Sequence, residues 1–168
     1  SCPPEKQLSD ADMRANAAQV LFAGVLTTST SFYNQMLTLM HHPEVKDKMV
    51  KEIEDVIGNR SVSINDKPKL PYVTAVINEG MRCVPGGLFV IPHTAVCDSD
   101  VLGVKIYKGS PITINMHSLF YDPETYPVPE KFKPLRFLDE NGQTLPADPP
   151  AMRRFTPFGV GPRVCAGQ

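Results

Sequence analysis

The first forty residues carry the pattern of one long helix. No proline occurs in residues 9–41, and Ser9 and Asp12 have the spacing of a capping box at the start of that segment. Residues 19–26 place apolar side chains on almost every face of the helix, so we expect this section of the helix to be buried. A helix of about thirty residues is about 45 Å long, which exceeds the span of a compact domain of this size. The pattern therefore predicts that further protein surrounds this helix.

Two shorter helices are predicted next. Residues 43–57 place their apolar side chains on one face, with a proline in the first turn and Gly58 at the stop. Residues 58–70 are polar and are expected to form a loop, and residues 71–83 form another helix that opens with a proline. The apolar positions of the first helix are Val45, Met49, Ile53, Val56 and Ile57, and the inward positions of the second are Val73, Val76, Ile77 and Gly80.

The second half of the chain alternates short β-rich runs with turns. Pro85-Gly86-Gly87 breaks the chain, and Pro92 confines the run that follows to a sheet edge or a bend. The fold class that we expect is mainly α with small β-sheets (α+β). The predicted β-rich segment spans 88–114, with strands in 88–96, 101–106 and 111–114, followed by a helical turn in 115–120 and a proline-rich irregular meander in 121–157.

Composition and charge exclude some classes of function. The chain has 168 residues and a formal net charge of -1, so nothing in it suggests a nucleic-acid-binding surface. Its four cysteines have no CxxC pairing and no zinc-like spacing. No apolar run reaches the length of about 18 residues that a membrane span needs. Because the chain starts at Ser1 and stops three residues after Cys165, we expect residues 1–168 to be a single incomplete domain, a fragment of a longer chain.

The strongest candidate for chemistry is the run FGVGPRVCAG, residues 158–167. Cys165 lies in a stretch punctuated by glycine, where Gly159 and Gly161 allow tight turns that can point backbone N–H groups at a thiolate. Arg163 adds a positive charge two residues before the cysteine. A structural cysteine in a loop of glycine and proline is the simpler alternative.

The spacing F-x-x-G-x-R-x-C-x-G resembles the haem-thiolate signature of the cytochrome P450 superfamily. The resemblance covers essentially the whole sequence, but it matches only part of the later half of such a domain. It implies that Cys165 is the axial ligand of the iron in haem b (iron protoporphyrin IX). The other residues that it assigns to haem binding are Phe158, Gly161, Arg163 and Gly167, with His93 as a second partner of the propionates.

Residues 23–28, AGVLTT, resemble the oxygen-binding groove of the same superfamily. Thr27 then matches the threonine beside bound dioxygen, which makes it the candidate catalytic residue. Leu26 stands where the family has an acidic residue, and a leucine cannot relay protons. A kink of small residues in a core helix is the alternative interpretation. The apolar substrate pocket that the resemblance implies would be lined by Ala23, Gly24, Leu26, Leu88, Phe89 and Val90.

Glu79 and Arg82 form an E-x-x-R pair, which on a helix is usually a modest surface interaction. Its position ahead of residues 158–167 resembles the P450 pair that is buried with a third arginine and holds the cysteine loop in place. Arg136, in KPLRF, resembles that third member, although Leu135 replaces the glutamate that is frequent in the family. The resemblance therefore makes Glu79, Arg82 and Arg136 structural residues.

The function that the resemblance implies is a haem-thiolate monooxygenase, an oxidoreductase. Such an enzyme inserts one oxygen atom from dioxygen into a lipophilic substrate, here a steroid, a xenobiotic or a fatty acid. The electrons come indirectly from NADPH through NADPH–cytochrome P450 reductase, and cytochrome b5 is a further candidate partner. Residues 91–115 and 136–143 most resemble animal microsomal enzymes of the drug-metabolising and steroid 17-hydroxylase branches, which implies the cytosolic face of the endoplasmic reticulum membrane. We expect the fragment alone to be inactive.

Two other classes of function stay open. One is an isomerase or dehydratase of the P450 fold that does not activate dioxygen, which the leucine at position 26 favours. The other is a haem-binding paralogue without turnover. Product analysis with NADPH and reductase, compared with added peroxide, would separate the enzyme classes.

Overall fold

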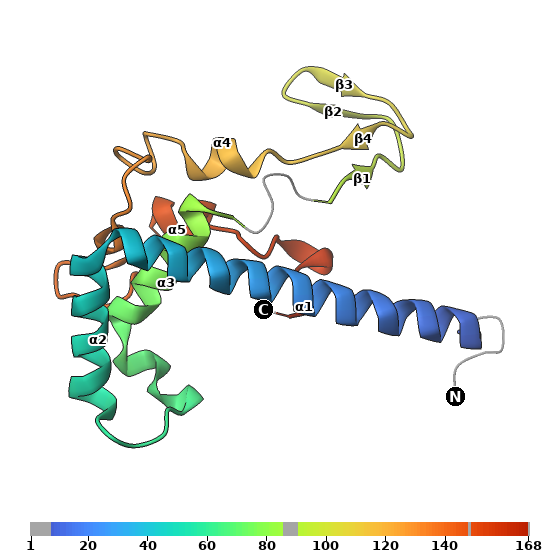
Figure 1. Cartoon of the computed structure of the whole chain (residues 1–168). Helices are drawn as coiled ribbons and strands as arrows, with labels where there is room; N and C mark the ends of the chain where they lie inside the picture. The colour runs from blue at the N-terminus through green and yellow to red at the C-terminus, as the bar shows by residue number, and fades with distance from the viewer. Residues whose placement is uncertain (1–7, 86–90, 148, 168) are drawn as a thin grey trace.

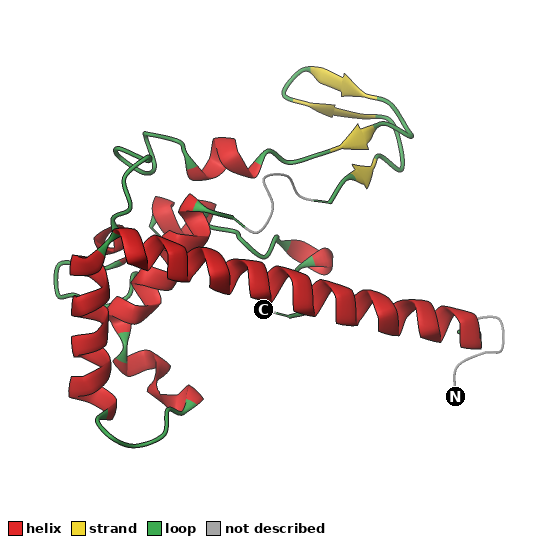
Figure 2. Ribbon diagram, viewed as in Figure 1, coloured by secondary structure: helices red, strands yellow, loops and turns green. Residues whose placement is uncertain are grey.

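The computed structural model describes residues 8–85, 91–147 and 149–167. It is mainly helical with two small antiparallel sheets, as the sequence predicts (Figures 1 and 2). The α-helices are α1 (Asp10–His41), α2 (Pro43–Ile57), α3 (Pro71–Cys83), α4 (Met116–Phe120) and α5 (Pro150–Arg154). The strands are β1 (His93–Thr94), β2 (Ser99–Val101), β3 (Val104–Ile106) and β4 (Pro111–Ile112), and the 3-10 helices are η2 (Ile64–Lys69), η3 (Pro134–Phe137) and η4 (Gly161–Arg163).

Helix α1 begins where its capping residues predict. The Ser9 hydroxyl oxygen accepts the backbone N–H of Asp12 at 3.2 Å, and the Asp12 carboxylate accepts the backbone N–H of Ser9 at 3.0 Å. Two of the N–H groups that have no partner inside the helix are thereby satisfied. Helix α1 ends at His41, and α2 begins at Pro43. The axis of α2 lies at a steep angle to that of α1 (Figure 1).

The expectation that residues 19–26 are buried is wrong for the structure described. Val20 is 72% exposed and Leu26 is 52% exposed. The reason is the placement of the other elements: buried and half-buried residues of α1 occur only from Ser31 onward, where α2 and α3 pack against its C-terminal end. The N-terminal half of α1 projects beyond the other helices (Figure 1). No helix within the described ranges is both long enough and apolar enough to span a membrane.

Helices α1 and α2 and the 3-10 helices η2 and η3 all pack against helix α3. Tyr72 and Val76 join Leu39 of α1 and Val45 of α2 in one apolar cluster. Ala75 faces a second cluster, which α3 shares with aromatic residues of the later chain. Ile77 is not buried as expected: it is 46% exposed and belongs to neither cluster.

The polar segment 58–70 contains structure that its composition does not suggest. It includes the 3-10 helix η2, which is opened by a second capping box between Ser63 and Asp66. Arg60 also donates two hydrogen bonds to the Asp66 carboxylate, at 2.7 and 2.8 Å. This hydrogen bonding lowers the pKa of Asp66 to about 2. The resulting stabilisation is complete above the pKa of the unfolded chain and is lost as the pH falls through the folded-state pKa.

The predicted strand 101–106 is in fact a hairpin. β2 pairs with β3 in antiparallel register, and the chain reverses at Leu102 and Gly103, which have φ angles of 52° and 82°. The side chain of Asp100 accepts the N–H of Gly103 at 2.9 Å and closes the turn. The second sheet pairs β1 with β4, so His93 lies opposite Ile112 at a sheet edge. The pairing therefore agrees with the edge position that Pro92 predicts.

One close contact fixes α1 against α3. Gln35 of α1 donates a hydrogen bond from Nε2 to the carbonyl of Ile77 at 2.9 Å. Its amide group occupies the space beside Gly80, where an added Cβ would lie 2.1 Å from Gln35 Oε1. The absence of a side chain at position 80 therefore allows the two helices to approach each other.

We predict that Gly80→Ala and Gln35→Ala are coupled. With Gln35 present, the new methyl group displaces the amide, so the hydrogen bond to Ile77 is lost at a cost of about 0.5–1.5 kcal/mol. With alanine at position 35 the space is free, and Gly80→Ala gains up to about 1 kcal/mol of helix propensity. Urea unfolding of the two single variants and the double variant measures the coupling. Equal effects of Gly80→Ala in both backgrounds would contradict the contact.

Candidate functional site

The cysteine run forms a compact loop directly after α5. Gly159 and Gly161 have φ angles of 77° and 76°, a region that residues with a side chain rarely adopt. Their turns bring the N–H of Cys165 to the carbonyl of Phe158, at 2.9 Å. The glycines at these two positions are thus explained by the backbone path that carries Cys165. No helix begins at Cys165 within the described residues, which end at Gly167.

The thiol of Cys165 lies at the surface of this loop. Cys165 is exposed and is not in a disulfide. Arg163 is exposed in η4, and Phe158 is also exposed, at 36%. A Cβ added to Gly167 would lie 3.8 Å from Cys165 Sγ, so the sulfur has space on that side. The sulfur and the guanidinium of Arg163 are therefore both available to a bound group.

The E-x-x-R pair lies fully inside the protein. The side chains of Glu79 and Arg82 are both 0% exposed. Arg82 Nε donates to Glu79 Oε2 at 2.7 Å, and Arg82 Nη2 donates to Glu79 Oε1 at 2.9 Å. Two parallel hydrogen bonds between a guanidinium and a carboxylate are the strongest form of this interaction.

Arg82 also donates to Cys83 Sγ at 2.9 Å and to two backbone carbonyls from distant parts of the chain. Nη1 donates to the carbonyl of Phe120 at 2.7 Å, and Nη2 donates to that of Pro129 at 2.8 Å. The guanidinium also lies over the rings of Tyr121 and Tyr126, with its carbon 5.4 and 5.3 Å from their centroids. Burial alone lowers the pKa of Arg82, but the hydrogen bonds and charge of Glu79 outweigh it and raise the pKa overall. Arg82 therefore stays charged in the interior.

Arg136 completes the cluster. Its Nε donates to Glu79 Oε1 at 3.0 Å, and the backbone N–H of Lys133 donates to the same oxygen at 2.8 Å. The other two nitrogens of Arg136 bind the carbonyls of Pro127, Val128 and Lys131 at 3.1–3.2 Å. One carboxylate thus accepts from two arginines and a backbone amide. Every buried side-chain nitrogen or oxygen in the described part of the chain has a hydrogen-bond partner.

The groove residues lie on the exposed part of α1. The Thr27 hydroxyl donates to the carbonyl of Ala23 at 2.6 Å, as expected for a threonine in this position. Leu26 is beside it, and no atom lies within 4 Å of the position that a Cβ of Gly24 would take. Among the described residues, no hydrogen bond or ion pair joins these groups to Cys165 or to His93.

The other predicted site residues are only partly covered by the structure. His93 is exposed in β1. The predicted pocket residues Leu88, Phe89 and Val90 lie outside the described residues. The assignments of His93 and Arg163 to propionates and of Thr27 to dioxygen therefore stay predictions.

Several residues near the site have no signal in the sequence. Tyr126 is fully buried and donates from its hydroxyl to the carbonyl of Ala151 at 2.7 Å. Arg154 of α5 binds Asp122 and Thr125. These contacts join segments separated by 25–32 positions, so no periodicity or local motif indicates them.

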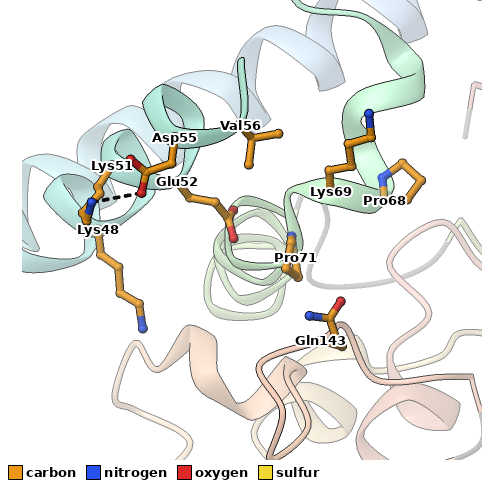
Figure 3. A pocket seen from close by; sticks show the side chains of 9 residues that line it. All are labelled: Lys48, Lys51, Glu52, Asp55, Val56, Pro68, Lys69, Pro71 and Gln143. Atoms are coloured by element: carbon orange, nitrogen blue, oxygen red, sulfur yellow. Dashed lines mark hydrogen bonds and ion pairs between the residues drawn. The ribbon is translucent and has the colours of Figure 1, made fainter. Parts of the chain in front are cut away.

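A shallow hollow of about 460 Å³ lies between α2 and the start of α3 (Figure 3). The Glu52 carboxylate accepts the backbone N–H groups of Tyr72 and Val73 at 3.0 and 2.8 Å, so it caps α3. Lys51 is paired with Asp55 at 2.9 Å. Glu52, Lys51 and Asp55 are therefore already engaged in contacts within the fold. Its lining residues are Lys48, Lys51, Glu52, Asp55, Val56, Pro68, Lys69, Pro71 and Gln143.

Comparison with known proteins identifies the family. The sequence model of the cytochrome P450 family matches residues 3–168. The chain belongs to the cytochrome P450 family. Residues 158–167 and the Glu79–Arg82 pair lie within the matched range, and the predicted fold class is that of the family.

The chain is similar to animal P450s over nearly all of its length. It is 37% identical to the steroid 17-alpha-hydroxylase/17,20 lyase of Gallus gallus over 166 residues, which are 98% of this chain and 32% of that protein. It is 38% identical to cytochrome P450 2E1 of Oryctolagus cuniculus over 158 residues, which are 94% of this chain and 31% of that protein. The chain thus spans about a third of the length of these relatives.

Solved structures agree with the sequence comparison. A zebra fish cytochrome P450 with progesterone superimposes with a TM-score of 0.86 and 33% identity, covering 100% of this chain and 37% of that one. A second zebra fish cytochrome P450 structure, with abiraterone, gives a TM-score of 0.88 at 32% identity, covering 100% of this chain and 39% of that one.

Membership of the P450 family implies a haem group, and the residues present fit one. The loop carries one exposed thiol that is not in a disulfide, and Gly167 leaves space beside its sulfur. The exposed guanidinium of Arg163 lies two residues before that thiol and suits an anionic propionate. A donor set of one thiolate and one cation matches axial ligation of a haem iron.

We predict that Glu79→Ala lowers the free energy of unfolding by about 3–5 kcal/mol, because it leaves two arginines without their shared carboxylate in a dry interior. Asp55→Ala serves as the control, because it removes an exposed pair with Lys51 that contributes at most about 1 kcal/mol. Denaturant unfolding of both variants measures the difference. Equal stability of the two variants would show that the buried cluster does not support the fold.

Proposed function

We propose that this chain is the thiolate-bearing part of a P450 monooxygenase that binds haem b through Cys165. The observation that carries the proposal is the exposed thiol of Cys165, in a chain of the P450 family. This thiol lies on a loop in which Gly159 and Gly161 have positive φ angles. When bound, the haem supplies the activation of dioxygen for transfer of one oxygen atom to a C–H bond. The protein's part is to bind, orient and deliver protons.

The residues of the loop have separate tasks in this proposal. Cys165 binds the iron as a thiolate, and the turns at Gly159 and Gly161 fix the direction of its side chain. Arg163 neutralises a propionate, with His93 as the second propionate partner. Phe158 would cover the sulfur from one side, and Gly167, which has no side chain, would leave the porphyrin face free.

Thr27 is proposed to hold a hydrogen bond beside dioxygen. Its only hydroxyl proton is donated to the carbonyl of Ala23, so its oxygen is left as an acceptor on the open side of α1. Leu26 places a hydrocarbon chain where the family has an acid, and therefore contributes no proton. Ala23, Gly24 and Leu26 would form an apolar wall of the substrate pocket, together with Leu88, Phe89 and Val90.

The substrate class proposed is a lipophilic small molecule, with a steroid favoured among steroid, xenobiotic and fatty acid. The support is that similar proteins are named steroid 17-alpha-hydroxylase/17,20 lyase, and that a zebra fish P450 structure contains progesterone. The proposed electron source is NADPH through NADPH–cytochrome P450 reductase, with cytochrome b5 as a further partner. The proposed location is the cytosolic face of the endoplasmic reticulum membrane.

A P450-fold isomerase or dehydratase is the second candidate function. Leu26 favours it, because such reactions need no proton relay to dioxygen. The two candidates differ in a measurable requirement: the monooxygenase consumes NADPH and dioxygen, whereas the isomerase or dehydratase consumes neither.

We predict that Cys165→Ala abolishes thiolate ligation in the full-length protein. The carbon monoxide complex of the reduced protein carries a red-shifted Soret band only when a thiolate is the opposite ligand, so this band should disappear. Cys97→Ala is the matched control, because Cys97 is also exposed and not in a disulfide but lies outside the loop. Retention of the band in Cys165→Ala would refute the assignment.

We also predict that Leu26→Glu raises the product formed per NADPH consumed. A carboxylate beside Thr27 restores a proton donor, so less activated oxygen escapes as peroxide. Leu26→Gln is the control, since it is similar in size and polar but cannot release a proton near neutral pH. Coupling that is equal in the two variants would mean that protons reach dioxygen by another route.

A further inference from the structure

Helix α5, which leads into the cysteine loop, is held by one turn of the preceding meander. This turn comprises residues 122–126. Its Tyr126 hydroxyl donates to the carbonyl of Ala151 at 2.7 Å, and Arg154 Nη1 donates to Thr125 Oγ1 at 2.8 Å and to the Asp122 carboxylate. Both ends of the five-residue helix α5 are therefore attached to the same turn.

The turn itself is closed by its own hydrogen bonds. The N–H of Tyr126 donates to the carbonyl of Asp122 at 2.8 Å, and the Thr125 hydroxyl donates to the Asp122 carboxylate at 2.5 Å. Hydrogen bonding from Thr125 is the main reason that the pKa of Asp122 is lowered. A charged carboxylate and a closed turn together present a rigid surface to α5.

The other side of the turn faces the buried cluster. Arg82 lies over the ring of Tyr126 at 5.3 Å, and the ring of Phe137 lies 6.4 Å from it. Phe155, the first residue after α5, packs its ring 4.9 Å from Phe137 and 5.7 Å from Phe120. Tyr126 thus touches the Glu79–Arg82 pair with its ring and α5 with its hydroxyl.

After Phe155, the hydrogen bonds of the cysteine loop lie within the loop. Its backbone hydrogen bonds join Gly159 to Thr156, Val164 to Gly161 and Cys165 to Phe158, all within the loop. No hydrogen bond or ion pair within the described ranges ties residues 156–167 to the rest of the fold. The position of the loop is therefore set by the residues that hold α5 and Phe155.

We propose that Tyr126 and the Asp122–Arg154 pair are positioning residues for the Cys165 thiolate. They act through α5, and they link the location of the thiol to the buried Glu79–Arg82 pair. The inference rests on the proposed function in one respect, which is that Cys165 ligates haem. A tyrosine that merely fills the core would need its ring but not its hydroxyl, and this difference makes the proposal testable.

The test compares Tyr126→Phe with Tyr121→Phe in the full-length holoprotein. Each variant removes one hydroxyl and keeps a ring beside Arg82. The Tyr121 hydroxyl donates to the carbonyl of Cys83 at 2.9 Å, so its loss removes a similar hydrogen bond that does not reach α5. We expect Tyr126→Phe to lower the ratio of thiolate-ligated to thiolate-free haem by about tenfold and to shift the reduction potential. Tyr121→Phe should leave both unchanged at a comparable melting temperature.

Amide hydrogen exchange gives a second readout that needs no haem. The N–H groups of Gly159, Val164 and Cys165 should exchange about tenfold faster in Tyr126→Phe than in Tyr121→Phe. If the parent protein shows no thiolate-ligated haem, the proposed function fails, and the exchange rates still decide the role of Tyr126. If the two variants agree in ligation, potential and exchange, the positioning role is overturned.

The ion pair has its own control within the chain. Asp122→Asn and Arg154→Gln should each lower the thiolate-ligated fraction, and the double variant should be no worse than the more affected single variant. The exposed pair of Lys51 and Asp55 provides the matched comparison, because Asp55→Asn and Lys51→Gln should leave ligation unchanged. Ligation that is kept in Arg154→Lys would support a role of the charge, and additive losses from Asp122→Asn and Arg154→Gln would overturn the pairing.

Discussion

The structure depends on one constraint, which is the complete burial of the Arg82 guanidinium. A buried guanidinium is stable only when its charge is paired and each of its donors finds an acceptor. Glu79 supplies the charge, but the remaining donors bind the carbonyls of Phe120 and Pro129. Because Phe120 ends α4 and Pro129 lies in the irregular segment that follows, Arg82 determines where the chain after α4 must pass. The proline-rich meander is thereby shaped by a side chain of α3.

Local signals predicted the parts of the fold that local physics decides. The Ser9 capping box marked the start of α1, and the spacing of Glu79 and Arg82 placed both on one face of α3. The sequence predicts one strand over residues 101–106, whereas the chain forms a hairpin that turns at Leu102 and Gly103. The apolar residues on both sides of the turn give the pattern of a continuous strand. What the sequence could not indicate is the set of backbone carbonyls that Arg82 binds. Carbonyls are common to all residues, so only the three-dimensional path selects them.

The candidate site also has a part that the sequence predicts and a part that it does not. The glycines and Cys165 are close in sequence, and their spacing predicts a tight loop that the φ angles of Gly159 and Gly161 bear out. The groups that hold this loop in place are far from it in sequence, since Tyr126 and Asp122 contact α5 across 25 and 32 positions. The exposure of residues 19–26 in α1 is a third case. The periodicity of a sequence indicates that one face of a helix is apolar. It does not indicate which element covers that face, because this depends on the assembled fold.

The meander also shows how a buried cluster can hold a strained backbone. Val128 has a φ angle of 55°, which a β-branched residue rarely adopts and which costs about 1–3 kcal/mol. Its carbonyl accepts hydrogen bonds from the backbone of Lys131 and from Arg136, and Arg136 also binds Glu79. A strained residue persists only where its surroundings over-determine it. The conformation of Val128 therefore follows from Glu79, 49 positions earlier in the chain, because the carboxylate fixes Arg136 and Arg136 fixes the turn.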